Sequence, residues 1–172
     1  MKISEAIEAI KQKYKKNPNG WLTAENVELQ KKALLLYFFS LDFLEGKNEI
    51  ETLKKCGAAF RNITVVHLLF DEINNGGLMQ YYTNSSGQQF IFTEQALKEM
   101  DMKDMLAVMS KTNPIMEKAL ERAKGSFDDL DFTNSEAATI SKFDDEFYEL
   151  DSDSEQYDLL DEYLERHLND LI

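Results

Sequence analysis

The chain has few of the residues that build cross-links, sharp turns or metal sites with several ligands. Its 172 residues include one cysteine, two histidines, two prolines and seven glycines. A single cysteine excludes an internal disulfide framework and a zinc site with several cysteines. The small numbers of proline and glycine argue against collagen-like, low-complexity and turn-rich β architectures.

Long apolar segments are also missing. The longest apolar run extends from Ala33 to Phe39, far short of the roughly 20 residues that cross a bilayer as a helix. The first residues do not form a charged and then apolar leader, which argues against secretion. We therefore expect a cytoplasmic protein without a membrane partner.

Common catalytic signatures are missing as well. The sequence has no nucleotide motif of the Gly-x-Gly-x-x-Gly or Gly-x4-Gly-Lys type and no His-Glu-x-x-His motif. A Cys56–His67 nucleophilic pair is one alternative, but the apolar stripe around His67 favours a core histidine. The segment from Asp151 to Glu162 imitates a calcium loop, yet Gln156 stands where the sharp turn needs glycine. We expect no cofactor, no metal and no enzymatic activity.

Positive charge is scarce in one part of the chain. The sequence holds 19 basic and 32 acidic residues, a net charge of −13. Residues 1–124 have 17 basic and 16 acidic side chains, whereas residues 125–172 have 2 basic and 16 acidic ones. A chain with this charge repels nucleic acid and anionic membranes and attracts basic partners. The asymmetry predicts either an acidic tail or an acidic interaction face.

The acidic segment has the apolar periodicity of helices rather than the composition of a disordered tail. Phe143, Phe147 and Leu150 fall at positions i, i+4 and i+7, and a second apolar stripe runs over 154–172. This pattern is typical of amphipathic helices that turn their carboxylates outward. Eight carboxylates form the candidate partner-binding face: Asp144, Asp145, Glu146, Glu149, Asp158, Asp161, Glu162 and Glu165.

Helical spacing also dominates the rest of the chain. We predict helices over 3–16, 23–44, 49–56, 58–74, 93–100, 103–110 and 114–125, and a strand pattern only over 89–92. The sequence predicts an all-α, single compact domain over 1–172 with about eight to ten helices. Its near-neutral body, 1–124, would carry the acidic helical segment, 125–172, packed on it. Residues 125–134 are the candidate hinge.

A motif within residues 71–87 combines glycines with polar and aromatic side chains. Asn75, Gly76 and Gly77 permit a left-handed backbone and a close approach of helices, and Asn84 can cap a neighbouring segment. This favours a rigid elbow between helices over a ligand site. The motif residues are Glu72, Asn74, Asn75, Gly76, Gly77, Gln80, Tyr81 and Asn84.

This motif resembles the signature of the DMP19-like family, in which Asn-Asn-Gly-Gly is followed by Gln-Tyr and Asn-Ser. Leu78 stands where that signature usually has phenylalanine. The resemblance implies an acidic, all-helical protein, and the named member of the family is a dimeric DNA mimic that binds a transcription factor in place of DNA. We therefore expect a basic DNA-binding protein as partner and no direct binding of nucleic acid. The resemblance also allows a homodimer.

Two other functions stay open at this point. The same electrostatics suits an antitoxin or immunity protein that inhibits a basic nuclease. A pocket near His67, Asn74, Asn75, Gln80 and Tyr81 would suit a small-molecule binder or an enzyme. In that case the acidic face would serve solubility alone.

Overall fold

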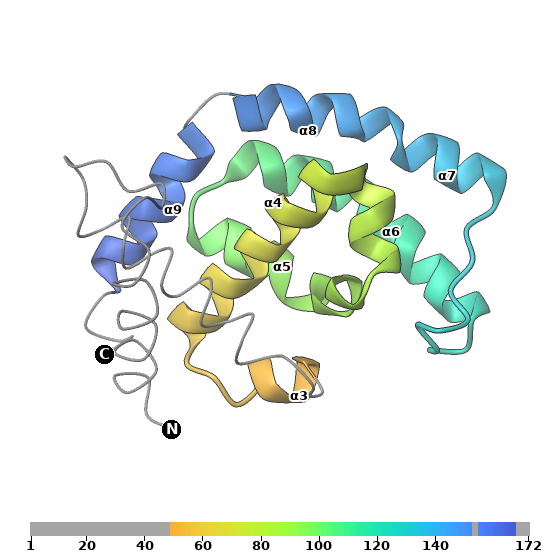
Figure 1. Cartoon of the computed structure of the whole chain (residues 1–172), viewed down its shortest axis with the longest axis horizontal. Coiled ribbons are helices and arrows are strands. Elements are labelled where there is room, and N and C mark those ends of the chain that lie inside the picture. The colour runs from red at the N-terminus through yellow and green to blue at the C-terminus, as the bar shows by residue number, and fades with distance from the viewer. Residues whose placement is uncertain (1–48, 153–154, 168–172) are drawn as a thin grey trace, which may run out of the picture. The chain divides into compact units, whose positions relative to one another are not determined.

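The computed structural model describes residues 49–152 and 155–167, and every regular element in this part is helical (Figure 1). In chain order the elements are α3 (Glu49–Leu53), α4 (Ala58–Thr83), the 3-10 helix η1 (Ser85–Gln89), α5 (Phe90–Glu99), α6 (Lys103–Arg122), α7 (Asn134–Ile140), α8 (Lys142–Ser152) and α9 (Glu155–Arg166). The all-α prediction is confirmed. The described residues hold seven α-helices, fewer than the eight to ten expected for the whole chain. The helices predicted over 3–16 and 23–44 lie outside the described residues.

The chain divides into two compact units. The first consists of residues 1–64 and 160–172, and the second of residues 65–159. Helices α4 and α9 therefore contribute residues to both units. The acidic residues 125–159 belong to the same unit as residues 65–124.

In the described part of the first unit, the beginning of α4 is joined to the end of α9. The Asn62 amide nitrogen donates to the hydroxyl oxygen of Tyr163 at 2.9 Å, and both side chains are buried. Leu160 and Leu164 of α9 are buried too, as the apolar stripe predicted. This side of α9 therefore contributes to the core of the first unit.

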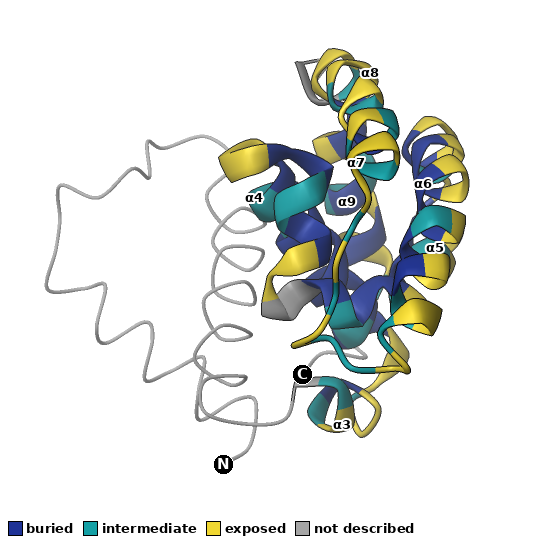
Figure 2. Cartoon of the chain, turned by 90° about the vertical axis from the view of Figure 1, so that its right-hand side faces the viewer, coloured by how far each residue is buried: buried dark blue, intermediate teal, exposed yellow. Residues whose placement is uncertain are grey.

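Helix α6 is the central element of the second unit. It packs against α5, α7 and α8, and Figure 2 shows the buried sides of α5 and α6 in dark blue, with exposed residues in yellow on their outer sides. The buried side of α6 repeats at helical spacing and contains Met105, Val108, Met109, Thr112, Met116 and Ala119. An apolar stripe of this kind is what places α6 in the middle of the unit.

Two buried tyrosines join the end of α4 to α5 and α6. The Tyr81 hydroxyl lies 2.7 Å from the hydroxyl oxygen of Thr93, which belongs to α5. The Tyr82 hydroxyl lies 2.7 Å from that of Thr112 and donates to the side-chain oxygen of Asn113 at 2.6 Å. Burial raises the pKa of both tyrosines. Both phenols therefore stay protonated, and their hydrogen bonds fix the end of α4.

Replacing Tyr82 by phenylalanine is expected to lower the free energy of unfolding by about 1–2 kcal/mol, because buried partners lose a hydrogen bond without gaining water. Tyr148→Phe is the matched control. The Tyr148 hydroxyl donates to the Ile73 carbonyl at 2.9 Å, but the side chain is 40% exposed. Water can replace that bond, so urea unfolding should show a loss below about 1 kcal/mol. Equal losses would contradict the buried position of the Tyr82 hydroxyl.

Candidate functional site

Helix α8 turns an apolar side inward and acidic side chains outward. Phe147 is buried and Phe143 is half-buried, as their i, i+4 spacing predicted. The Phe147 ring meets the Phe70 ring of α4 edge-on, with 5.9 Å between the ring centroids. Asp145 and Glu149 are exposed and lie one helical turn apart. They form the outward row of α8.

Two other carboxylates of α8 have partners within the second unit. The Asp144 carboxylate accepts a hydrogen bond from the Leu78 backbone N–H at 2.8 Å. Burial raises the pKa of Asp144, and Asp145 adds to this effect, although the bond from Leu78 opposes it. Glu146 is ion-paired with Lys111 of α6 at 2.9 Å. The structure thus separates Asp144 and Glu146 from the outward row.

Helix α9 presents a longer acidic row. Asp158, Glu162 and Glu165 are exposed, whereas Asp161 is half-buried. Glu155, which lies outside the eight carboxylates of the candidate face, is exposed as well. Because positions 155, 158, 162 and 165 follow helical spacing, these four side chains share one side of α9.

A further group of acidic side chains lies in the loop between α6 and α7. Arg122 at the end of α6 holds both carboxylate oxygens of Glu136, at 2.8 and 2.6 Å. This hydrogen-bonded pair, together with the Thr133 backbone N–H, holds the pKa of Glu136 at about 2. The loop that this contact ties down carries three exposed aspartates: Asp128, Asp129 and Asp131. Their clustering in the sequence is the signal that could have indicated this group, but residues 125–134 were predicted only as a hinge.

The Asn-Asn-Gly-Gly motif lies within α4 and interrupts it. Gly76 and Gly77 have non-helical backbone angles, so the helix bends between them. The Glu72 carboxylate accepts hydrogen bonds from the side-chain nitrogens of Gln80 at 2.9 Å and Asn84 at 2.7 Å. One carboxylate before the bend therefore holds two amides after it, which is the arrangement of a rigid elbow.

Residues 56–167, more than half of the chain, match the family model described as DMP19-like protein. The chain belongs to the DMP19-like family. Neither the curated proteins nor the solved structures contain a significant match. The resemblance drawn from the motif is thus confirmed at the level of the family.

Charge in this DMP19-like protein is segregated between its two units. Residues 65–159 contain 7 basic and 20 acidic side chains, whereas the remaining residues contain 12 of each. The second unit therefore carries the entire net charge of −13. Its acidic residues include the outward row of α8, the loop aspartates and the first part of the α9 row.

The residues proposed for a small-molecule pocket are divided between interior and surface. Tyr81 is fully buried, whereas Asn74 and Asn75 are exposed and Gln80 is held by Glu72. Burial lowers the pKa of His67 to about 4, although the side chain is half-buried rather than fully buried. These five residues of the DMP19-like chain therefore do not present one polar surface to a ligand.

The described residues also bear on the other chemical alternatives. The half-buried Cys56 lies just after α3, and its thiol donates to the carbonyl oxygen of Thr52 at 3.3 Å. Positions 155–162 of the calcium-like segment lie in α9, not in a loop. Within 49–152 and 155–167, no group of three or more acidic, histidine or cysteine side chains is placed to hold a metal ion. None of the helices described here is long and apolar enough to cross a membrane.

Proposed function

We propose that this DMP19-like protein is a non-enzymatic DNA mimic. Its outward carboxylates bind a basic DNA-binding protein at the surface where that protein binds DNA, and thereby block the DNA site. The observation that carries the proposal is the segregation of charge, since one unit holds 20 acidic and only 7 basic residues. Such a field attracts lysine- and arginine-rich surfaces and speeds association with them.

The acidic row of α9 supports the proposal through its spacing. Glu155 and Glu165 are ten residues apart, which corresponds to about 15 Å along a helix at about 1.5 Å per residue. Four exposed carboxylates over this length give one charge per about 5 Å, whereas one DNA strand carries one per about 3.4 Å. The α9 row alone is sparser than a DNA strand. We therefore propose that the contact charge comes from the second unit, in which the Asp145–Glu149 row of α8 adds to Glu155 and Asp158 of α9.

Affinity capture from the native host tests the proposal. The immobilised chain, loaded with lysate at low salt and eluted in salt steps, is expected to yield a basic DNA-binding protein at moderate salt. In a gel-shift assay, the DMP19-like protein should then release that protein from its labelled DNA site. An affinity that stays flat as salt rises, or capture of only ribosomal and other abundant basic proteins, would contradict the proposal.

A pair of matched double variants locates the binding surface. Asp145→Asn/Glu149→Gln removes two exposed carboxylates one turn apart on α8, and Glu117→Gln/Glu121→Gln does the same on α6. Both variants change the net charge equally. The α8 variant should weaken partner binding about tenfold at low salt and the α6 variant less than about threefold, because exposed ion pairs contribute up to about 1 kcal/mol each. Equal effects would show that only net charge matters.

The class of the captured protein also distinguishes between the two possible functions, a DNA mimic and a nuclease inhibitor. If the captured protein is a nuclease, its cleavage of DNA should be measured with and without the DMP19-like protein. Inhibition of cleavage, without any displaced regulatory site, would replace the proposed function by that of an immunity protein.

A further inference from the structure

Helix α4 is broken at two glycines, and a side chain of α8 fills the break. The backbone angles are φ −171° and ψ 24° at Gly76, and φ 78° and ψ −179° at Gly77. Directly after the break, the Leu78 N–H donates to Asp144 Oδ1 at 2.8 Å. The first N–H groups of a helical segment have no acceptor within the segment. The Asp144 carboxylate therefore caps residues 78–83 from another helix.

Gly77 leaves the room that this carboxylate occupies. Its φ of 78° lies in the left-handed region, which glycine adopts without a steric penalty. A Cβ atom at this position would lie 2.7 Å from Asp144 Oδ2 and 2.9 Å from its Cγ. Any side chain at position 77 would thus displace the Asp144 carboxylate from the break.

The break keeps its shape through contacts that do not involve α8. Glu72 lies before the break, and it accepts hydrogen bonds from Gln80 and Asn84, which lie after it. These bonds join the two sides of the break directly. Removal of the Asp144 carboxylate should therefore loosen the contact of α8 with the break while it leaves the bend of α4 in place.

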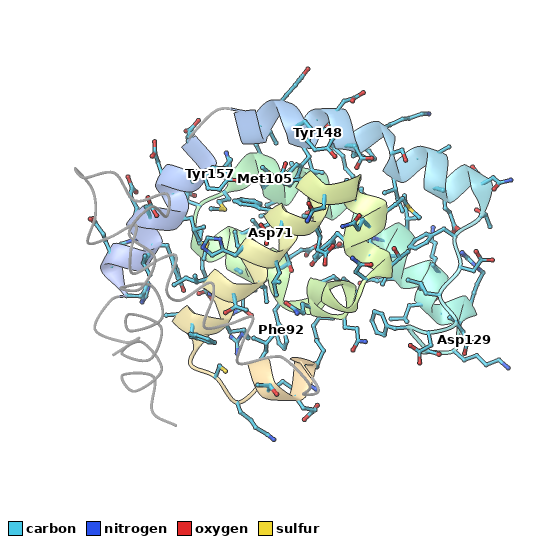
Figure 3. All side chains as sticks on the ribbon, in the orientation of Figure 1. Asp71, Phe92, Met105, Asp129, Tyr148 and Tyr157 are labelled. Atoms are coloured by element: carbon cyan, nitrogen blue, oxygen red, sulfur yellow. The ribbon has the colours of Figure 1, made fainter. Side chains whose placement is uncertain are left out.

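Two further contacts hold the same side of α8 against α4. The Tyr148 hydroxyl donates to the Ile73 carbonyl oxygen at 2.9 Å, and the Phe147 ring packs edge-on against Phe70. Figure 3 shows Tyr148 on α8 beside α4. Because positions 144, 147 and 148 are related by i, i+3 and i+4, all three contacts lie on one side of α8.

The outward row occupies the other side of the same helix. Asp145 and Glu149 each follow one residue after an inward contact, which is a rotation of about 100° around an α-helix with about 3.6 residues per turn. The direction in which Asp145 and Glu149 point is therefore set by how α8 is held. The hydrogen bond from the Leu78 N–H to Asp144 holds α8 at the break itself.

We propose that Asp144 is a positioning residue of the interaction surface. Its carboxylate fixes α8 on the Gly76–Gly77 break and thereby sets the direction in which Asp145 and Glu149 face a basic partner. This inference rests on the proposed function, and it replaces the direct partner contact that the sequence suggested for Asp144. It also assigns a role to Gly76 and Gly77 of the motif, which form the break of α4 on which the acidic helix α8 packs.

The anchor is tested first in the free protein, by amide hydrogen exchange at Leu78. Asp144→Ala and Gly77→Ala should each speed this exchange at least about tenfold, because they remove or displace the hydrogen-bond acceptor. Asp144→Asn retains a side-chain oxygen at the same place and should stay within about threefold of the unmodified chain. Unchanged exchange in Asp144→Ala would overturn the anchor, whatever the partner is.

The role in binding is tested with a short oligo-arginine peptide as a probe of contact charge. Asp145→Asn should weaken its binding about threefold at low salt, the effect of one exposed ion pair. Asp144→Asn should leave it unchanged, since the carboxylate faces α4. A loss in Asp144→Asn equal to that in Asp145→Asn would make Asp144 a contact residue and overturn the proposal.

The effect of α8 orientation is then tested by measuring how tightly each variant binds the DNA-binding protein captured from lysate. Asp144→Ala should weaken its binding at least as much as Asp145→Asn, about threefold or more, and Asp144→Asn should restore it. If Asp144→Ala binds this protein as the unmodified chain does, the orientation of α8 does not matter and the proposal fails. Failure of the proposed function gives a different result. Asp144→Ala would still speed amide exchange at Leu78, but no variant, Asp145→Asn included, would change the affinity for the captured protein.

Discussion

Replacing Gly87 by alanine is expected to lower the free energy of unfolding by about 3 kcal/mol, at the upper end for an overpacked position. The 3-10 helix η1 carries the chain back across the last turn of α4, where the Gly87 N–H donates to the Asn84 carbonyl at 2.9 Å. A Cβ atom at position 87 would meet the carbonyl oxygen of Tyr82 and lie 2.7 Å from that of Tyr81. Both are backbone atoms, so the added methyl group has no flexible side chain to push aside.

The loss extends beyond the turn because of what the two tyrosines hold. Their hydroxyls bond to α5 and α6, so a shift of the last turn of α4 also weakens those buried hydrogen bonds. Urea unfolding of Gly87→Ala, followed by circular dichroism at 222 nm (a wavelength for helix), measures the effect. For a chain of about this length each kcal/mol corresponds to roughly 2–4 °C in the melting temperature.

Gly57→Ala is the matched control for this prediction. Gly57 is exposed, and a Cβ atom there would have no neighbour within 4 Å. The Arg61 N–H donates to the Gly57 carbonyl at 3.0 Å, so Gly57 is the residue that caps the start of α4, and alanine there should cost less than about 1 kcal/mol. Equal unfolding midpoints for Gly57→Ala and Gly87→Ala would contradict the path of η1 over the end of α4.

The fold class followed from the sequence because apolar residues repeat at helical intervals. The stripe through Phe143 and Phe147 correctly predicted the inner side of α8, and the leucines of α9 behaved likewise. The stripe was less accurate at Tyr157, which is 39% exposed although its ring lies 5.4 Å from that of Phe70. Tyrosine can satisfy an apolar and a polar environment at once, so its place in a stripe predicts burial poorly.

Some predicted boundaries of helices and strands were wrong, because a local sequence signal was either outweighed by other contacts or not used. The predicted break at Pro114 was wrong, because α6 continues through it; Ser110 and Pro114 are both exposed, so water is available to the carbonyl that proline leaves without a donor. The strand pattern over 89–92 was wrong as well, since Phe90 to Phe92 begin α5. Helix α7 was missed although Thr133 and Glu136 form a capping box, which the spacing of the sequence displays.

The inward carboxylate of the candidate site could not be predicted from its own segment. Asp144 lies among acidic residues, and an acidic residue in an amphipathic pattern is normally assigned to the solvent side. Its partner is an N–H group 66 residues earlier, which lacks an acceptor only because α4 is broken at two glycines. The motif and the acidic segment could each be recognised in the sequence. Their contact could not, because it forms only when α4 and α8 pack together in the second unit.

His67 should make the stability of the protein depend on pH in a defined direction. Burial lowers its pKa from an ordinary value of 6.5 to about 4, so the unfolded chain takes up a proton at mildly acidic pH while the folded one does not. The stabilisation is complete above about pH 6.5 and declines as pH falls toward about 4. Between about pH 7.5 and about pH 5, this linkage should lower the free energy of unfolding by about 2 kcal/mol.

The His67 contribution is isolated by comparing two proteins at two pH values. Asp71 and Asp144 have pKa values raised by burial, so their effect on the pH dependence of stability is opposite in sign to that of His67. They are present in both the unmodified chain and His67→Gln, and their effect cancels in the difference between the two pH dependences. Urea unfolding should show the unmodified chain losing about 2 kcal/mol more than His67→Gln on acidification. Identical pH dependences would mean that His67 is protonated in the folded state, and hence that the apolar side of α4 is open to water there.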